Sequence, residues 1–392
     1  MERRTFTRNV ALGALGVGAA GLTGSPARAA QRGPRPAESE KKQWAREHLR
    51  GLGGLVMPSF SPDFKALDEE GIRQDVRHRI SQGFCSILVS ATGASADERR
   101  RTEDIVREES EGRILRSAIV GGGSAKAAIA SLDHAARLGC SHALIMFPDS
   151  LHPETEEDVY AYYREIIDST SLGILLYGRG VASLRRFHPS GIPFRAFDRL
   201  ADHPNVVGMK LTHGMAAGLA YELSEHLSDR LLMGPVHLDL VPVLGKHYPH
   251  VQWSSQWISD AVQSPGRPYG VELFDLVRQG RMADAMTVYW QMQPLIDLVY
   301  EIQGTLLKKT GAHPWQHMKY YQWVMGGNGG LLPLDGRESG PVLDNAARQL
   351  IRDTCASVGI AVDRPDEEFL VGRAAYARGV RASDLTSRPH YA

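Results

Sequence analysis

The chain has 392 residues, 43% of them hydrophobic, which is enough to bury the core of one large domain or two modest ones. Its 45 basic and 45 acidic residues cancel, so the composition excludes the strong overall field that attracts nucleic acid or an anionic membrane surface. The three scattered cysteines are too few for a disulfide framework or a zinc site, and we expect no bound metal.

The first thirty residues have the pattern of an export signal. Arg3 and Arg4 precede an apolar run over residues 10–22, and small residues at the spacing of a cleavage site follow, ending at Ala29. The apolar run is shorter than the ~20 residues that span a membrane. The pattern therefore predicts a twin-arginine signal over residues 1–30 and a mature chain that is periplasmic or extracellular, with no membrane attachment.

The central part of the chain alternates short apolar runs with amphipathic helical patterns, after a polar segment over residues 31–48 that we expect to be a linker. Eight such runs within residues 49–265 predict a closed (β/α)8 TIM barrel. An open doubly wound sheet is the alternative, but no glycine-rich dinucleotide loop follows the first run. The expected strands are 54–57, 86–89, 115–120, 143–147, 173–177, 206–210, 231–233 and 251–253.

The last third of the chain differs in character, because helical patterns follow one another without intervening strand patterns. Residues 266–362 are predicted to form a C-terminal helical domain. Residues 363–392 are charged, and we expect them to form a loosely packed tail. The predicted fold is thus an α/β barrel with a helical appendage.

Lys210 closes the sixth predicted strand, which is otherwise apolar. A lysine in this position either extends its amine to solvent or is placed there for the chemistry of that amine. Burial would lower its pKa and keep part of the amine neutral, which is the condition for attack on a carbonyl carbon. Active-site residues of a barrel lie at the carboxyl ends of the strands, where Thr92 and Tyr177 are also found.

Taken together and in order, residues 51–362 resemble the dihydrodipicolinate synthase and N-acetylneuraminate lyase family of class I aldolases. The matching segments are 67–72 with Gln82 and Gly83, which resemble the first helix of the family; Thr92 and Gly93, which fall on its Gly-Thr-Thr-Gly-Glu loop; 174–177, on the strand with its catalytic tyrosine; 207–210, on the strand with its Schiff-base lysine; and 330–334, in its C-terminal helical domain.

The resemblance implies that Lys210 forms a covalent imine with a 2-oxo acid of the pyruvate type, without a metal or organic cofactor. Tyr177 would relay protons, and the turn formed by Ala91, Thr92 and Gly93 would hold the carboxylate of the 2-oxo acid. An aldehyde-type compound would be the second substrate. The resemblance further implies that the protein forms a homodimer or homotetramer.

Three more residues are candidates because they lie where the mouth of the barrel is expected. His213 follows Lys210 by three residues and could take over proton relay. Gly234 follows the seventh predicted strand and Ser254 the eighth, and both are candidate substrate-binding residues.

The chain departs from the family pattern at several of these positions. Ala91 stands where the family has the first of two threonines, and the fourth strand is followed by Asp149 and Ser150 without the tyrosine of the family's relay. The arginine that grips the second carboxylate in the synthase is absent. Arg179 lies at a different offset and is a candidate substrate-binding residue. We therefore expect a lyase that is not a true dihydrodipicolinate synthase.

Two other functions remain open at this point. One is a hydratase-aldolase or dehydratase that acts on a sugar acid or an aryl 2-oxo acid. The other is a non-catalytic protein that binds an oxo acid outside the cytoplasm. Retention of both Lys210 and Tyr177 favours an enzyme.

Overall fold

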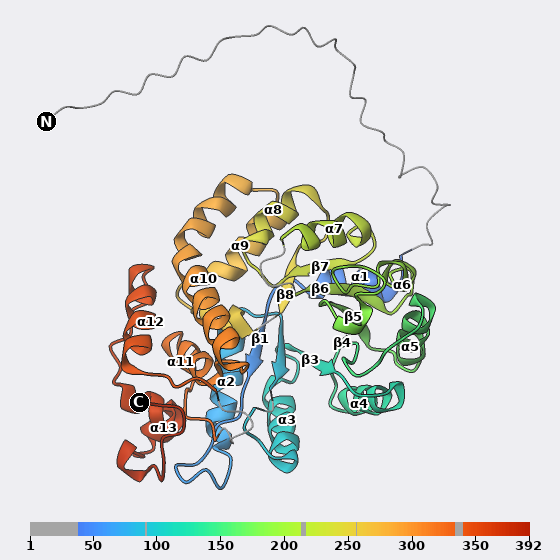
Figure 1. Ribbon diagram of the computed structural model, residues 1–392. Helices are drawn as coiled ribbons and strands as arrows, with labels where there is room; N and C mark the ends of the chain where they lie inside the picture. The colour runs from blue at the N-terminus through green and yellow to red at the C-terminus, as the bar shows by residue number, and fades with distance from the viewer. Residues whose placement is uncertain (1–37, 91, 213–216, 256, 334–339) are drawn as a thin grey trace, which may run out of the picture. The chain divides into compact units, whose positions relative to one another are not determined.

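The computed structural model describes residues 38–90, 92–212, 217–255, 257–333 and 340–392. Eight parallel strands pair in the order β7-β6-β5-β4-β3-β2-β1-β8. Near β7 and β8 the backbone N–H of Met233 donates to His250, so the sheet curls into a nearly closed barrel (Figure 1). The strands are β1 (Gly51–Val56), β2 (Ser86–Val89), β3 (Leu115–Val120), β4 (His142–Ile145), β5 (Gly173–Gly178), β6 (Val206–Leu211), β7 (Leu232–Pro235) and β8 (Trp253–Ser255). The predicted (β/α)8 fold is confirmed.

Helices alternate with these strands along the chain and lie around the barrel. They are α2 (Glu69–Ser81), α3 (Ala96–Ser110), α4 (Ala125–Arg137), α5 (Glu156–Asp168), α6 (Phe194–Leu200), α7 (Ala217–Leu227) and α8 (Leu240–His247). Side-chain caps fix several of their starts, as at Ser95 and Thr155, which form capping boxes. Gly83 and Gly139 follow α2 and α4 with φ of 76° and 72°, a conformation that favours glycine.

Helix α1 (Glu40–His48) occupies most of the segment that the sequence predicts to be a linker, so that prediction is wrong for residues 40–48. Ser39 caps the helix, and the Nζ of Lys42 donates to the carbonyl of Ala201 at 2.6 Å. Ala45 and Leu49 are fully buried in a cluster with Trp253. The polar composition of the segment hides the helix, because only a few of its side chains face the barrel.

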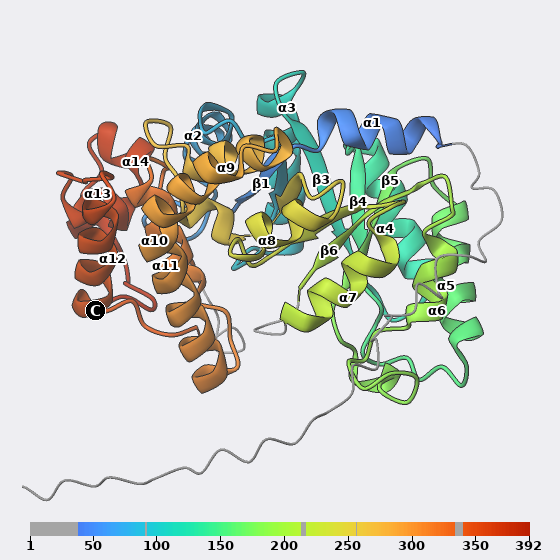
Figure 2. The same cartoon turned by 90° about the horizontal axis from the view of Figure 1, so that it is seen from above.

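The C-terminal helices gather beside β1 and α2 (Figures 1 and 2). They are α9 (Tyr269–Arg278), α10 (Met282–Thr310), α11 (Trp315–Val324), α12 (Asn345–Ser357), α13 (Asp366–Val371) and α14 (Arg373–Ala377). The expected loose tail is therefore wrong. Phe369 is fully buried, and Arg348 holds Asp366 at 2.9 Å. Charged side chains in this tail serve as ion-pair partners of α12, which composition alone does not reveal.

A buried polar cluster joins the barrel to the C-terminal helices. Arg79 of α2 contacts Asp260 at 2.7 Å, and neither side chain is exposed to solvent. The same carboxylate accepts from the backbone N–H of Leu55 in β1 at 3.0 Å and from Gln322 of α11 at 3.3 Å. Because three segments meet on one carboxylate, this cluster fixes the position of α11 against the first βα unit.

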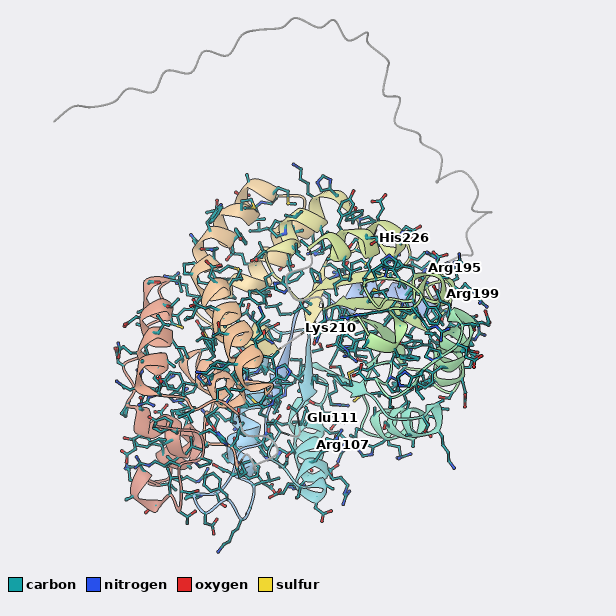
Figure 3. The ribbon with its side chains drawn as sticks, viewed as in Figure 1. Arg107, Glu111, Arg195, Arg199, Lys210 and His226 are labelled. Carbon is teal, nitrogen blue, oxygen red and sulfur yellow. The ribbon has the colours of Figure 1, made fainter. Side chains whose placement is uncertain are left out.

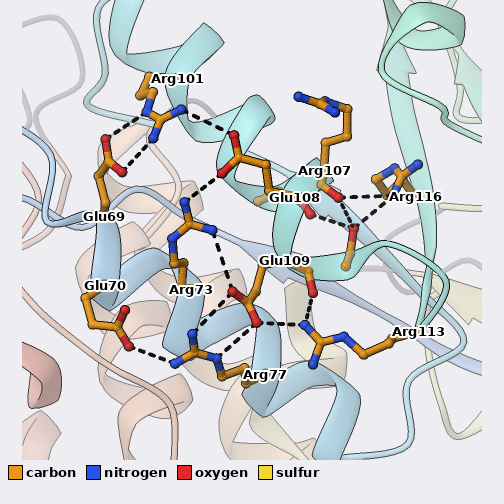
Figure 4. Close-up of polar contacts among 12 residues, drawn as sticks. Glu69, Glu70, Arg73, Arg77, Arg101, Arg107, Glu108, Glu109, Arg113 and Arg116 are labelled. Atoms are coloured by element: carbon orange, nitrogen blue, oxygen red, sulfur yellow. Dashed lines mark hydrogen bonds and ion pairs between the residues drawn. The ribbon is translucent and has the colours of Figure 1, made fainter.

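A second set of charges lies on the surface between α2 and α3 (Figure 4). Arg101 contacts Glu69 at 2.7 Å and Arg73 contacts Glu108 at 2.7 Å. The Arg101 and Glu69 side chains are 42% and 44% exposed, so a single pair of this kind contributes little, about 0–1 kcal/mol. The network links the surfaces of the two helices and adds little to the stability of the fold.

Candidate functional site

Lys210 lies near the carboxyl end of β6, with Tyr177 of β5 and Gly234 of β7 as its neighbours in register. Figure 3 shows Lys210 among the strands at the centre of the barrel. Its Nζ lies 5.8 Å from the centroid of the Tyr177 ring. The two residues that the sequence pairs at the ends of adjacent strands therefore do lie together.

Burial changes the protonation of both groups. It lowers the pKa of Lys210 from 10.5 to about 8. Near neutral pH roughly a tenth of the amine is then uncharged, a few hundred times the fraction of an exposed lysine. Burial also raises the pKa of Tyr177, an effect that Thr212 and Arg179 reduce. Tyr177 thus stays a neutral phenol that can donate and accept a proton.

Two cavities border this pair of residues. One, of about 410 Å³, lies where β3, β4 and β5 end, and its lining includes Tyr177, Arg179 and Asp149. The other, of about 20 Å³, lies inside the barrel, and its lining includes Lys210, His142 and Trp253. We call them the mouth cavity and the inner cavity. Tyr177 lines the mouth cavity and Lys210 lines the inner cavity.

Arg179 reaches the mouth cavity from the loop that follows β5. Its guanidinium carbon lies 6.0 Å from the Tyr177 ring centroid, and one of its nitrogens donates to both oxygens of Asp149 at 3.1 Å. The structure therefore brings this arginine to the site despite its unusual offset from Tyr177. Its charge, however, is already matched by a carboxylate from the loop after β4.

The turn after β2 is held by its own side chains and by the C-terminal segment. The hydroxyls of Ser90 and Thr92 lie 2.7 Å apart, and Thr92 is buried. Gly93 has a φ of 75°, and a Cβ at this position would lie 3.3 Å from Pro333. Glycine is thus favoured here by conformation and by close approach. Ala91 lies outside the described residues.

Ser254 does not line either cavity described here. Its hydroxyl donates to the carbonyl of Pro235 at 2.8 Å, and it is fully buried. Because side chains alternate along a strand, its neighbours Trp253 and Ser255 face the inner cavity instead. The prediction for Ser254 was therefore wrong in its placement, and Ser255 is the residue that it missed.

Gly234 also has a different role from the one predicted. A Cβ at this position would lie 2.6 Å from the ring of Trp253, so the glycine makes room for the indole. His213, the proposed alternative relay, lies outside the described residues.

Sequence reasoning missed Asp149 as a partner of Arg179, and it missed His142 and Trp253 inside the barrel. The position of His142 at the start of β4 was the available signal, since an imidazole there points either into the barrel or into the helix layer. In the part of the chain that the structure describes, no group of three or more His, Cys, Asp or Glu side chains is arranged to hold a metal ion.

Comparison with known proteins agrees with this geometry. Residues 48–233 match the dihydrodipicolinate synthetase family. The chain is 30% identical over 177 residues to 4-hydroxy-tetrahydrodipicolinate synthase of Rhodospirillum centenum, which covers 43% of this chain and 55% of that protein. It is 26% identical over 169 residues to N-acetylneuraminate lyase of Rhizobium meliloti, which covers 42% of this chain and 54% of that protein.

The chain thus spans about half the length of these curated relatives, 55% and 54%. A solved structure of dihydrodipicolinate synthase from Agrobacterium tumefaciens superposes with a TM-score of 0.61 and 19% identity, covering 80% of this chain and 99% of that one. This likeness shows a shared fold. The part of the chain that holds the strand-end lysine and tyrosine, residues 48–233, is the part that matches the dihydrodipicolinate synthetase family.

Proposed function

We propose that this protein is a class I aldolase-type lyase that forms an imine between Lys210 and a 2-oxo acid of the pyruvate type. The observation that carries the proposal is the amine of Lys210 at the carboxyl end of a barrel strand, where burial lowers its pKa to about 8. A partly neutral amine is the nucleophile that imine formation requires. The match to the family supports the same chemistry.

The steps follow from the groups present. The neutral amine adds to the ketone carbon, the carbinolamine takes up a proton and loses water, and the protonated imine then withdraws electrons from the adjacent carbon. That carbon can form or break a bond to an aldehyde carbon. Tyr177, next to Lys210 and bordering the mouth cavity, would move the protons. Thr92 would hold the carboxylate of the 2-oxo acid.

Trapping of the imine tests this proposal. Borohydride reduction in the presence of pyruvate should add the substrate's carbons to Lys210, as read by peptide mass mapping. Lys319 of α11 is a matched internal control, because burial also lowers its pKa but its amine lies 3.6 Å from the carboxylate of Asp75 in α2. Label on Lys319 and not on Lys210, or no label with any of a broad panel of 2-oxo acids, would overturn the proposal.

We further propose that the second substrate lacks a second carboxylate. Among the described residues that line the mouth cavity, Arg179 and Asp149 are the charged ones, and they pair with each other. An electrophile with a carboxylate would have to separate this pair, whereas an uncharged aldehyde would not. Loss of a charge-assisted contact to a carboxylate costs about 1.5–3 kcal/mol.

Steady-state assays of the mature protein with aspartate semialdehyde and with uncharged aldehydes test this preference. Asp149→Asn frees the charge of Arg179 and should shift kcat/KM toward the carboxylated electrophile. Asp133→Asn removes an exposed carboxylate on α4 and should change nothing. Efficient use of aspartate semialdehyde by the unaltered protein would contradict the preference and leave the imine at Lys210 intact.

We also propose that the protein is exported by the twin-arginine route, on the pattern of its first thirty residues. These thirty residues lie outside the described part of the chain. Within the described part, no helix is long and apolar enough to cross a membrane. A homo-oligomer stays a prediction, which size-exclusion chromatography with light scattering can test.

A further inference from the structure

The inner cavity is lined by several polar side chains, although the core of a barrel is usually apolar. Its lining includes Lys210, His142, Trp253, Ser117 and Ser255. With a volume of about 20 Å³, it has room for one water molecule, which needs on the order of 10–15 Å³ and two to four polar partners.

Two of these side chains have a buried polar atom without a partner among the described residues. They are the Nε2 of His142 and the Nε1 of Trp253. His142 is 0% exposed and Trp253 is 1% exposed, so solvent outside the barrel does not reach them. Both residues line the same cavity, and their rings meet edge to face with centroids 6.5 Å apart. Buried polar atoms are nearly always paired, so a pair of orphans at one cavity indicates a bound molecule.

We assign the donor and the acceptor at these two atoms from the contacts of Ser141 and from the chemistry of the indole ring. The hydroxyl of Ser141 donates to the carbonyl of Arg116 and lies 2.9 Å from the Nδ1 of His142. With the hydroxyl proton on that carbonyl, Nδ1 carries the imidazole proton and donates to the Ser141 oxygen, which leaves Nε2 as the acceptor; the proposal below rests on this tautomer. Burial lowers the pKa of His142 to about 4, which keeps this neutral form near pH 7. The Nε1 of Trp253 can only donate.

We propose that the inner cavity holds one water molecule that donates to His142, accepts from Trp253 and accepts from the Nζ of Lys210. Its second proton goes to the hydroxyl oxygen of Ser117, whose own proton is donated to the carbonyl of Ile87 at 3.1 Å. All four positions around the water are then used. His142 and Trp253 become positioning residues that act on Lys210 through this water.

The water gives the amine an acceptor on the side away from the substrate. It stabilises the N–H groups of the ammonium ion and, once the imine has formed, its single N–H. The described titratable groups that face Lys210 are His142 from β4 and Tyr177 from β5, and both are neutral near pH 7; across the mouth, Arg179 and Asp149 pair with each other. The effect of the water on Lys210 is therefore not masked by a nearby unpaired charge.

Because this role presupposes the proposed imine at Lys210, the test follows the pH dependence of borohydride trapping with pyruvate. His142→Phe removes the acceptor and fills the cavity, so the ammonium ion loses a charge-assisted hydrogen bond. The pH midpoint of trapping should fall by about one unit or more. Trp253→Phe keeps a ring, removes only the donor and should lower the midpoint less. His142→Gln retains an acceptor and should recover part of the shift.

His78→Phe is the matched control. His78 is another buried histidine whose Nε2 lacks a partner among the described residues, but it lies on α2 against Gly326. Its substitution should leave the midpoint unchanged.

A crystal structure of the mature protein provides a second measurement. It should show one water oxygen within hydrogen-bond distance of both His142 Nε2 and Trp253 Nε1. Normal trapping with an unshifted midpoint in both His142→Phe and Trp253→Phe, or a dry cavity in that crystal structure, would overturn the inference and leave the proposed function standing. Failure of the unaltered protein to form any imine would instead overturn the proposed function, and this role of the water with it.

Discussion

Replacement of Asp260 by alanine should destabilise the protein far more than loss of an equally short ion pair on its surface. The carboxylate of Asp260 lies 2.7 Å from Arg79, accepts from the backbone of Leu55 at 3.0 Å and accepts from Gln322 at 3.3 Å. None of the three side chains is exposed to solvent. Burial raises the pKa of Asp260 to about 6, so the carboxylate is still mostly ionised at pH 7.

The loss of unfolding free energy depends on which buried groups lose their partner. Asp260→Ala leaves the cation of Arg79 and two N–H groups in a site that water does not reach. Breaking a buried ion pair from one side costs about 3–5 kcal/mol. Asp260→Asn keeps an acceptor for the Leu55 N–H and should cost less, about 1–3 kcal/mol. Adding Arg79→Met to Asp260→Leu removes both charges, so this double variant should be more stable than Asp260→Ala alone.

Equilibrium urea denaturation, followed by tryptophan fluorescence, measures these free energies of unfolding. The matched control is Asp284→Ala, which breaks a contact with Arg281 that is also 2.7 Å long but has side chains 57% and 54% exposed. It should cost about 0–1 kcal/mol. A loss for Asp260→Ala that is no larger than the loss for Asp284→Ala would refute the reasoning, because the two pairs differ mainly in burial.

Three further outcomes are expected. The rate of imine trapping at Lys210 should rise with pH through a midpoint near 8, since the neutral amine is the nucleophile; a midpoint near 10.5 would mean that burial does not act on this amine. Tyr177→Phe should keep its urea midpoint but lower turnover by ~10²–10⁴-fold, as for a lost acid–base group, and full activity would exclude Tyr177 from proton transfer. Changing Arg3 and Arg4 to lysine should retain the precursor in the cytoplasm, as fractionation would show, and normal export would disprove the twin-arginine assignment.

The barrel could be predicted from the sequence because strands buried on both faces are continuous apolar runs, which composition reveals directly. The errors arose where burial depends on few side chains. Helix α1 and its C-cap residue pack through Lys42, Ala45 and Leu49, which lie among charged residues. The C-terminal tail packs through Phe369 and ion pairs. In sequence, both segments look like solvent-exposed polar segments, because the surfaces that they pack against cannot be seen in the sequence.

The sequence predicts those site residues that lie at the ends of strands. Lys210 and Tyr177 lie in register because both close buried strands. The eighth strand begins two residues later than predicted, and the alternation of side chains places Ser255, not Ser254, on the inner face. The contact between Arg179 and Asp149 depends on the conformations of two loops, which no periodicity encodes.

Helix α1 sets a practical limit on where the chain can be shortened. The match to the family begins at residue 48, which is where this helix ends. A truncation placed at that family boundary would delete the side chains of Trp44 and Ala45, which pack near His142 and Trp253 at the amino end of the barrel. An expressed chain that starts at the family boundary would thus expose the amino end of the barrel to water. A chain that begins before Ser39 keeps helix α1, its N-cap and the side chains that cover this end of the barrel.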